Sequence, residues 1–353
     1  MKHHAMVLSA AVSAAALLAS CAHTARVTGS DGRPLALEVS EMERVRLNGT
    51  DQWIYTAGTS RDNPILLWLD GGPGGTEVGT VRRYLGPLHE SFTVVCWDQR
   101  GTGRSRRAVR DWRSARVEEW VEDTIELSRL LAGRQGGRPI YLVGYSWGSI
   151  IGVMAARKAP ELYAAYVGVG QQVNSVENDT IGWVMVRDGT RAAGEDKVAD
   201  TLERYGPPPY EDGDRYFYLF RRLYRYSPHP PVPSDFDSTW YFRAPEHRLV
   251  DKVNSVRGLT DGVKYVYPLL SELDFERTAM RFECPVFIVN GRYDLTCVAD
   301  IADRWFRKIE APVKDLVWFE NSGHNPCYQQ PEDFTAYLTG TVVPRAEAAR
   351  QSR

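Results

Sequence analysis

Cysteine and histidine are scarce in this sequence, which has 5 Cys and 7 His among 353 residues. Its charges show no excess of either sign, because 43 basic residues stand against 45 acidic ones. Nucleic-acid binding needs a basic excess or stripe, so this balance argues against a nucleic-acid partner. The sequence also lacks H-E-x-x-H spacing for a metal and a glycine fingerprint for a dinucleotide. We therefore expect no metal and no cofactor.

Long apolar runs are absent too, apart from a weakly apolar, alanine-rich run over residues 5–19. This run is too short to span a bilayer comfortably and suits the apolar part of an export signal. It ends in Ala19-Ser20-Cys21, which resembles a bacterial lipobox, whose cysteine becomes the lipidated first residue. We expect residues 1–21 to be a lipoprotein signal, with a lipid anchor on Cys21 as the contact with the membrane of the cell envelope. The alternative is a plain signal cleaved near Ala22, which would give a secreted or periplasmic protein.

Short apolar runs bounded by turn residues recur along the chain, as expected for strands buried on both faces. They cover residues 64–69, 92–97, 139–143, 165–169, 285–289 and 316–319. Helical patterns lie between them, at residues 116–131, 150–158, 299–309 and 331–338. This alternation predicts a doubly wound, mostly parallel α/β sheet. Residues 40–56 alternate polar and apolar positions and predict an antiparallel hairpin at the sheet edge.

The alternation stops between residues 171 and 280, a stretch rich in proline and aromatic residues. An insertion between parallel strands lies above the carboxyl edge of the sheet, where open α/β folds bind ligands. We predict a largely helical cap domain over residues 171–280. The core then divides into residues 39–170 and 281–345, preceded by a tether at 22–38 and followed by a tail at 346–353.

The motif Gly144-Tyr145-Ser146-Trp147-Gly148 follows one predicted strand directly and opens a predicted helix. This is the context of a nucleophile elbow, in which the serine sits on a sharp, strained turn above the sheet. Larger side chains at Gly144 and Gly148 would clash across that turn. The sequence therefore predicts that Ser146 is a catalytic nucleophile in an α/β-hydrolase fold.

A serine nucleophile needs a base and an acid that orients the base. His324 lies in the loop after the last predicted strand, which places it at the same sheet edge as Ser146. Asp294 lies in the loop after the preceding strand. The order Ser, Asp, His is the chain order of this fold. We predict a catalytic triad of Ser146, Asp294 and His324.

The tetrahedral intermediate of acyl transfer needs hydrogen-bond donors for its oxyanion. One predicted donor is the backbone N–H of Trp147, the residue after the nucleophile. The other should come from the glycine-rich loop Asp70-Gly71-Gly72-Pro73-Gly74-Gly75 at the end of a strand. We choose Gly72 as this donor. The loop is not a phosphate-binding loop, because no Gly-Lys-Ser/Thr follows it.

Three motifs together resemble the proline iminopeptidase family of α/β-hydrolases, peptidase family S33. Asp70-Gly71-Gly72-Pro73-Gly74 is similar to its His-Gly-Gly-Pro-Gly, and residues 98–105 are similar to its Asp-Gln-Arg-Gly-x-Gly-x-Ser. The elbow is similar to its Gly-Gly-Ser-Trp-Gly. The resemblance implies a serine aminopeptidase that removes an N-terminal residue, often proline, from short peptides. It further implies that Asp98, Gln99 and Arg100 brace the loops around the oxyanion turn.

The sequence departs from this family in two ways. Asp70 stands where the family has histidine, which changes the polarity beside the oxyanion turn. The family uses acidic cap residues to hold the substrate amine, and no motif selects among the candidates here. The candidates are Glu203, Glu211, Asp212, Asp214, Glu272 and Asp274. A carboxylesterase or lactonase acting on a small ester with the same triad therefore stays open as an alternative.

Cys297 and Cys327 each follow a predicted triad residue by three positions, on loops that must be adjacent. In an exported protein this spacing predicts a disulfide between them, and two free thiols are the alternative. The expected partner of the protein is a small molecule or short peptide. The sequence indicates no oligomeric state.

Overall fold

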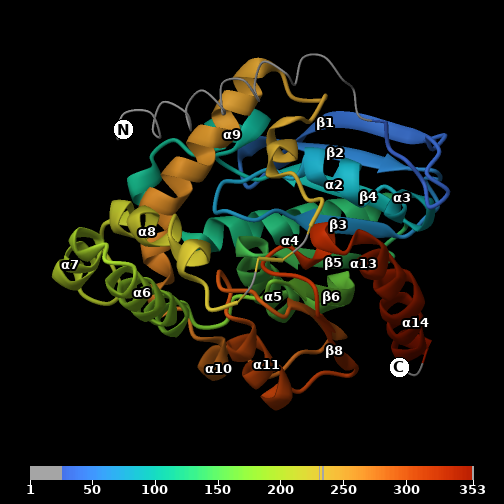
Figure 1. Cartoon of the computed structure of the whole chain (residues 1–353). Coiled ribbons are helices and arrows are strands. Elements are labelled where there is room, and N and C mark those ends of the chain that lie inside the picture. The colour runs from blue at the N-terminus through green and yellow to red at the C-terminus, as the bar shows by residue number, and fades with distance from the viewer. Residues whose placement is uncertain (1–25, 230, 233, 352–353) are drawn as a thin grey trace.

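The computed structural model describes residues 26–229, 231–232 and 234–351 (Figure 1). These residues contain an eight-stranded sheet with the order β1-β2-β4-β3-β5-β6-β7-β8. β2 pairs antiparallel with both β1 and β4, and all other neighbours are parallel. The strands are β1 (Val39–Leu47), β2 (Thr50–Gly58), β3 (Ile65–Leu69), β4 (Thr93–Asp98), β5 (Ile140–Tyr145), β6 (Tyr163–Val169), β7 (Val286–Gly291) and β8 (Lys314–Phe319). The predicted α/β-hydrolase fold with its mostly parallel sheet is confirmed.

Helices cover both faces of the sheet, which explains why central strands such as β3 are buried along their whole length. The core helices are α2 (Val78–Tyr84), α3 (Leu88–Ser91), α4 (Val117–Arg134), α5 (Trp147–Lys158), α11 (Ala299–Lys308), α12 (Pro326–Gln329), α13 (Pro331–Tyr337) and α14 (Val343–Gln351). One apolar cluster joins the sheet to α4, α5 and α11, and a second joins its other face to α2 and α12–α14. Short 3₁₀ turns follow β4 and α5, and a π-helical turn links α13 to α14.

The chain between β6 and β7 forms helices, and we keep the name cap for residues 171–280. Its helices are α6 (Ser175–Ala192), α7 (Asp196–Tyr205), α8 (Gly213–Phe220), α9 (Leu249–Asp261) and α10 (Phe275–Thr278). Shorter turns are η4 (Leu223–Tyr226), η5 (Ser238–Phe242), η6 (Gly262–Val266) and η7 (Tyr267–Glu272). The cap has an apolar cluster of its own, built around Trp183 and Leu219. Figure 1 shows α6, α7 and α8 grouped beside the sheet, with α9 above them.

The two predicted ends of the core are corrected by the structure. Within the predicted tether, Val27 is buried, and the Ser30 N–H donates to Glu90 Oε1 at 2.6 Å. Residues 27–30 therefore contact the core before β1 begins, whereas most of residues 31–38 are exposed. The predicted tail is helical, because α14 continues to Gln351 and buries Ala346 in the second apolar cluster. The predicted signal and Cys21 lie outside the described residues.

None of the helices within the described residues is long and apolar enough to cross a membrane.

Candidate active site

Ser146 occupies the turn between β5 and α5 in a strained backbone conformation. Its φ is 54° and its ψ is −118°, a region that few residues other than glycine adopt. A Cβ on Gly144 would overlap the backbone of Gly148, and a Cβ on Gly148 would overlap the carbonyl of Leu69. The two glycines of the motif are thus required by the close approach of backbone segments. The local geometry is that of a nucleophile elbow.

The three residues predicted as a triad lie together. Ser146 Oγ is 3.0 Å from His324 Nε2, and His324 Nδ1 is 2.9 Å from Asp294 Oδ2. Asp294 follows β7 and His324 follows β8, so adjacent parallel strands deliver both side chains to the edge where β5 delivers Ser146. When Asp294 accepts from Nδ1–H, Nε2 is left to accept the hydroxyl proton of Ser146.

The carboxylate of Asp294 is fixed by the backbone of its own loop. Asp294 Oδ1 accepts hydrogen bonds from the N–H groups of Thr296 and Cys297, each at 2.9 Å. The Asp294 side chain is 1% exposed, whereas that of His324 is 13% exposed. The buried acid is therefore held rigidly, and the imidazole it orients reaches the cavity side of the site.

Gly72 and Trp147, the predicted oxyanion donors, line one cavity together with Ser146. Trp147 is the first residue of α5, and the N–H groups of a first helical turn have no acceptor within the helix. Gly72 has a φ of 142°, which only glycine adopts readily. Both backbone segments therefore meet beside the Ser146 hydroxyl.

Residues 98–100 connect the glycine-rich loop and the start of α5 to the rest of the core. Gln99 Nε2 donates to the carbonyl of Asp70 at 3.1 Å, and Gln99 Oε1 accepts from Trp147 Nε1 at 3.0 Å. Asp98 Oδ1 accepts from Thr76 Oγ1 at 2.8 Å. Gln99 thus bridges the two predicted donor segments. Arg100 is directed elsewhere, to acidic residues of α4.

Asp70 and Glu77 form a buried acidic pair beneath the glycine-rich turn. The Glu77 carboxylate accepts from Trp68 Nε1 at 2.6 Å, from Tyr328 OH at 2.8 Å and from the Gly71 N–H at 3.2 Å. Burial raises the pKa of Glu77 to about 7. Burial, together with the negative charge of Glu77, raises the pKa of Asp70 well above its usual range. Burial and the charge of Glu77 therefore both disfavour ionisation of the acid that replaces the family's histidine.

Two cavities meet at Ser146, and both are also lined by Gly72 and Thr296. The larger has a volume of about 260 Å³, and we call it the His324 lobe. Its other walls include Glu77, Tyr145, Tyr241, Phe242, Leu259 and His324. The smaller has a volume of about 100 Å³, and we call it the Trp147 lobe. Its apolar walls include Trp147, Ile150, Phe220, Val263, Tyr267 and Leu270.

The six acidic cap candidates do not line either lobe. They are Glu203, Glu211, Asp212, Asp214, Glu272 and Asp274. Four of them lie on the surface, where Asp212 caps α8 and Asp214 pairs with Lys264. The other two, Glu272 and Asp274, line a separate cleft. Sequence reasoning missed Asp179 in α6, which no motif marks.

Asp179 is 2% exposed and lines neither lobe itself, but it contacts one residue of the Trp147 lobe wall. Its Oδ1 accepts from Tyr267 OH at 3.0 Å, and Tyr267 lines that lobe. Its Oδ2 has no hydrogen-bond partner within the described residues. Burial raises the pKa of Asp179 to about 7. A buried carboxylate with one unpartnered oxygen is suited to receive a donor from a ligand.

The predicted disulfide is wrong, because Cys297 and Cys327 are both free thiols. The thiol of Cys297 is hydrogen-bonded to Ser146 and lies at the Trp147 lobe. Cys327 belongs to α12 and packs in the second apolar cluster, where it interacts with Glu77. The loops are adjacent, as the triad requires, but the two side chains point to different groups.

The part of the chain that the structure describes holds no group of three or more His, Cys, Asp or Glu side chains arranged for a metal ion.

The fold and the elbow place this chain in a known class of proteins. Residues 65–336 match the model of the alpha/beta hydrolase family, so the chain belongs to that family. It is 27% identical over 321 residues to "Probable aminopeptidase YbaC" of Bacillus subtilis, covering 87% of this chain and 97% of that protein. It is 23% identical over 296 residues to "Probable proline iminopeptidase" of Leptolyngbya boryana, covering 76% and 83%.

A similar fold occurs in the crystal structure of proline iminopeptidase from Mycobacterium smegmatis. The TM-score is 0.64 at 17% identity, covering 88% of this chain and all of that one (100%). The predicted resemblance to proline iminopeptidases is thus confirmed as a similarity of sequence and fold.

Proposed function

We propose that this protein is a serine hydrolase that uses Ser146, His324 and Asp294 as a catalytic triad. The hydrogen-bonded chain from Ser146 Oγ through the His324 imidazole to Asp294 carries the proposal. In the first half-reaction Ser146 Oγ attacks the substrate carbonyl carbon while His324 Nε2 takes the hydroxyl proton. The N–H groups of Gly72 and Trp147 stabilise the oxyanion.

The intermediate then collapses. The bond to the leaving amine breaks, His324 gives its proton to that amine, and an acyl-enzyme ester remains on Ser146. A water molecule loses a proton to His324 and attacks the ester carbonyl. The acid leaves, and the proton returns to Ser146. Asp294 keeps its charge throughout and stabilises the imidazolium formed in each half.

The preferred substrate in this proposal is a short peptide or amino-acid amide with a free N-terminus. The motif resemblance and the named relatives support a peptidase. The leaving group belongs in the His324 lobe, because His324 protonates it, so the acyl residue belongs in the Trp147 lobe. That lobe is small and apolar, as a proline or similar residue requires. Asp179 contacts the wall of this lobe through Tyr267, and in this proposal its unpartnered Oδ2 receives the substrate amine.

A panel of aminoacyl-4-nitroanilides and 4-nitrophenyl esters tests this function. We expect turnover of the anilides, with prolyl and small apolar residues preferred, and we expect Ser146→Ala to abolish it. Hydrolysis of esters alone would replace the peptidase by a carboxylesterase or lactonase. Full activity in a folded Ser146→Ala variant would overturn the mechanism. Asp179→Asn should raise KM for anilides with a free amine and leave ester hydrolysis unchanged.

We further propose that the protein is exported and lipid-anchored through Cys21. The support is the alanine-rich run that ends at that cysteine. Expression of the full chain in a bacterial host, followed by membrane fractionation, tests the proposal. Wild-type protein should be found with membranes, and Cys21→Ser should lose the lipid and be released from the membrane fraction. Equal fractionation of both proteins would contradict lipidation.

A further inference from the structure

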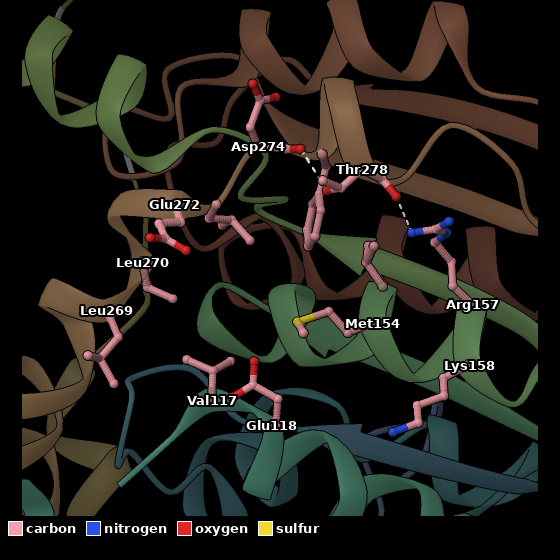
Figure 2. Close-up of a pocket in the computed structure, with 13 residues that line it drawn as sticks. Val117, Glu118, Met154, Arg157, Lys158, Leu269, Leu270, Glu272, Asp274 and Thr278 are labelled. Atoms are coloured by element: carbon pink, nitrogen blue, oxygen red, sulfur yellow. Dashed lines mark hydrogen bonds between the residues drawn. The ribbon is translucent and has the colours of Figure 1, made fainter. Parts of the chain in front are cut away.

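A large cleft lies between the cap and the core, on the side of the Trp147 lobe away from Ser146. Its volume is about 520 Å³. Figure 2 shows its walls: the start of α4, the second half of α5, and the cap segment from η7 to α10. Its lining residues do not include Ser146, His324 or Asp294. The triad therefore does not use this space.

Leu270 of η7 lines both the cleft and the Trp147 lobe. It is 3% exposed and belongs to the apolar core cluster. Helix α5 runs past the same partition: Trp147 and Ile150 line the lobe, and Val153 and Met154 line the cleft. Two cavities that share one helix wall are thus separated at Leu270.

We propose that Leu270 is the end wall of the acyl pocket and limits the enzyme to a single residue before the cleaved bond. The inference rests on the proposed function, in which the acyl residue occupies the Trp147 lobe. A lobe of about 100 Å³ holds one small residue. A preceding residue extends from the substrate amine beside Tyr267, and Leu270, one 3₁₀ turn further along η7, stands between that position and the cleft. The closed end, rather than the triad, makes the enzyme an exopeptidase.

The cleft beyond the wall has the character of a peptide-binding groove. Its inner surface is apolar, with Val117, Met154, Leu273 and Phe275 among its walls. Charged side chains of both signs surround this surface (Figure 2). They are Glu118, Arg157, Lys158, Glu272 and Asp274. An extended peptide offers apolar side chains to such a surface and polar groups to its rim. Removal of the wall should therefore open a usable subsite for one or more additional residues.

The test compares two substrates that differ by one residue. One is the 4-nitroanilide of the residue that the wild type prefers, and the other is the same anilide extended by an N-terminal alanine. Wild type should strongly prefer the shorter substrate. Leu270→Ala should raise kcat/KM for the longer substrate at least tenfold relative to the shorter one. Leu269→Ala is the matched control, because Leu269 lines only the cleft and is 46% exposed. It should leave the ratio unchanged.

A second pair of variants separates an opened passage from a loosened core. Met154→Trp should fill the cleft next to the partition and reverse the gain when it is combined with Leu270→Ala. Met154→Trp alone should leave the shorter substrate unaffected. If Leu270→Ala does not fold, as judged by circular dichroism, Leu270→Val is used instead. It should raise relative kcat/KM for the longer substrate in the same direction, but by less.

An unchanged substrate ratio in folded Leu270→Ala or Leu270→Val would overturn the inference. So would a wild type that cleaves both anilides equally, or a gain that Met154→Trp does not reverse. Failure of the proposed peptidase function looks different, since the wild type would then cleave neither anilide. In that case the same comparison is made with 4-nitrophenyl acetate and 4-nitrophenyl octanoate. These esters test the wall because Leu270 limits the length of the acyl group, whatever the leaving group is.

Discussion

His247 of the cap and Asp98 of the core form a buried hydrogen-bonded pair, with 2.9 Å between Nε2 and Oδ2. The two side chains are 1% and 0% exposed. Asp98 also accepts a hydrogen bond from Thr76, which directly follows the glycine-rich loop and lines the His324 lobe. The pair therefore connects the cap directly to the loop that carries Gly72.

This pair predicts a pH-dependent contribution to stability. Burial is the largest single effect and lowers the pKa of His247. The charge and hydrogen bond of Asp98, together with the charges of Asp251 and Glu246, outweigh it, so the pKa is raised. A histidine with a raised folded-state pKa contributes stability that is present below its unfolded pKa and is lost as pH rises through the folded value. His247→Gln should lower the free energy of unfolding by about 1.5–3 kcal/mol at pH 6 and by less at pH 9. Denaturant unfolding at the two pH values measures this, and an equal loss at both would contradict an ionised pair.

A second pH dependence of stability is expected from the buried carboxyl group of Glu77. Burial raises its pKa to about 7, so the folded state loses stability relative to the unfolded state as pH rises from about 4.5 to 7. Glu77→Gln cannot ionise and should reduce the stability difference between pH 5 and pH 8 by on the order of 1–3 kcal/mol. Thermal unfolding of both proteins at the two pH values is the measurement. An unchanged pH dependence in Glu77→Gln would contradict this prediction.

Asp294→Asn should reduce kcat about 10⁴-fold with little change in fold. An asparagine amide can donate to Nδ1, which favours the wrong imidazole tautomer and leaves Nε2 unable to accept from Ser146. Asp300→Asn, in the first turn of α11, is a matched control that should keep wild-type kcat. A kcat within tenfold of wild type in Asp294→Asn would remove Asp294 from the triad.

The end of cap helix α9 and Gly262, the first residue of η6, pack backbone to backbone against the glycine-rich loop. A Cβ on Gly262 would overlap the carbonyl of Pro73, and a Cβ on Gly258 would lie 2.9 Å from the carbonyl of Gly74. Gly262→Ala should therefore displace the loop, lowering kcat about tenfold and stability by about 1–3 kcal/mol. Gly133→Ala in α4 meets no atom within 4 Å and should stabilise the protein by about 0.5–1 kcal/mol. Equal behaviour of the two variants would show that the α9 contact is not tight.

Much of the fold could be predicted because its signals are local. The run Ile65-Leu66-Leu67-Trp68-Leu69 is apolar throughout, as a strand covered on both faces must be, and it forms β3. The elbow glycines are equally local, since the turn itself forbids larger side chains. The ends of the core were mispredicted because Val27 and Ala346 are buried by contacts with distant parts of the chain, which local polarity does not reveal.

The direction of side chains explains the remaining errors. Cys297 and Cys327 are equally spaced from Asp294 and His324, but spacing along a loop does not fix where a thiol points. Six cap acids were candidates because the sequence shows their charge. Asp179 was missed because the sequence does not show that its side chain is buried. Burial and orientation are properties of packing, and packing brings together α6, η7 and the loop after β7 from distant positions.

The sequence by itself determined how Ser146, Asp294 and His324 come together, because each follows a strand and parallel strands deliver their carboxyl ends to one edge of a sheet. Only the tertiary structure decided what surrounds them: the buried acids Asp70 and Asp179, and Leu270 at the boundary of two cavities. The cap that supplies two of these residues has no repeating pattern that fixes its packing. Its helices are placed by contacts between residues far apart in the chain, and those contacts set the size and polarity of the space around Ser146.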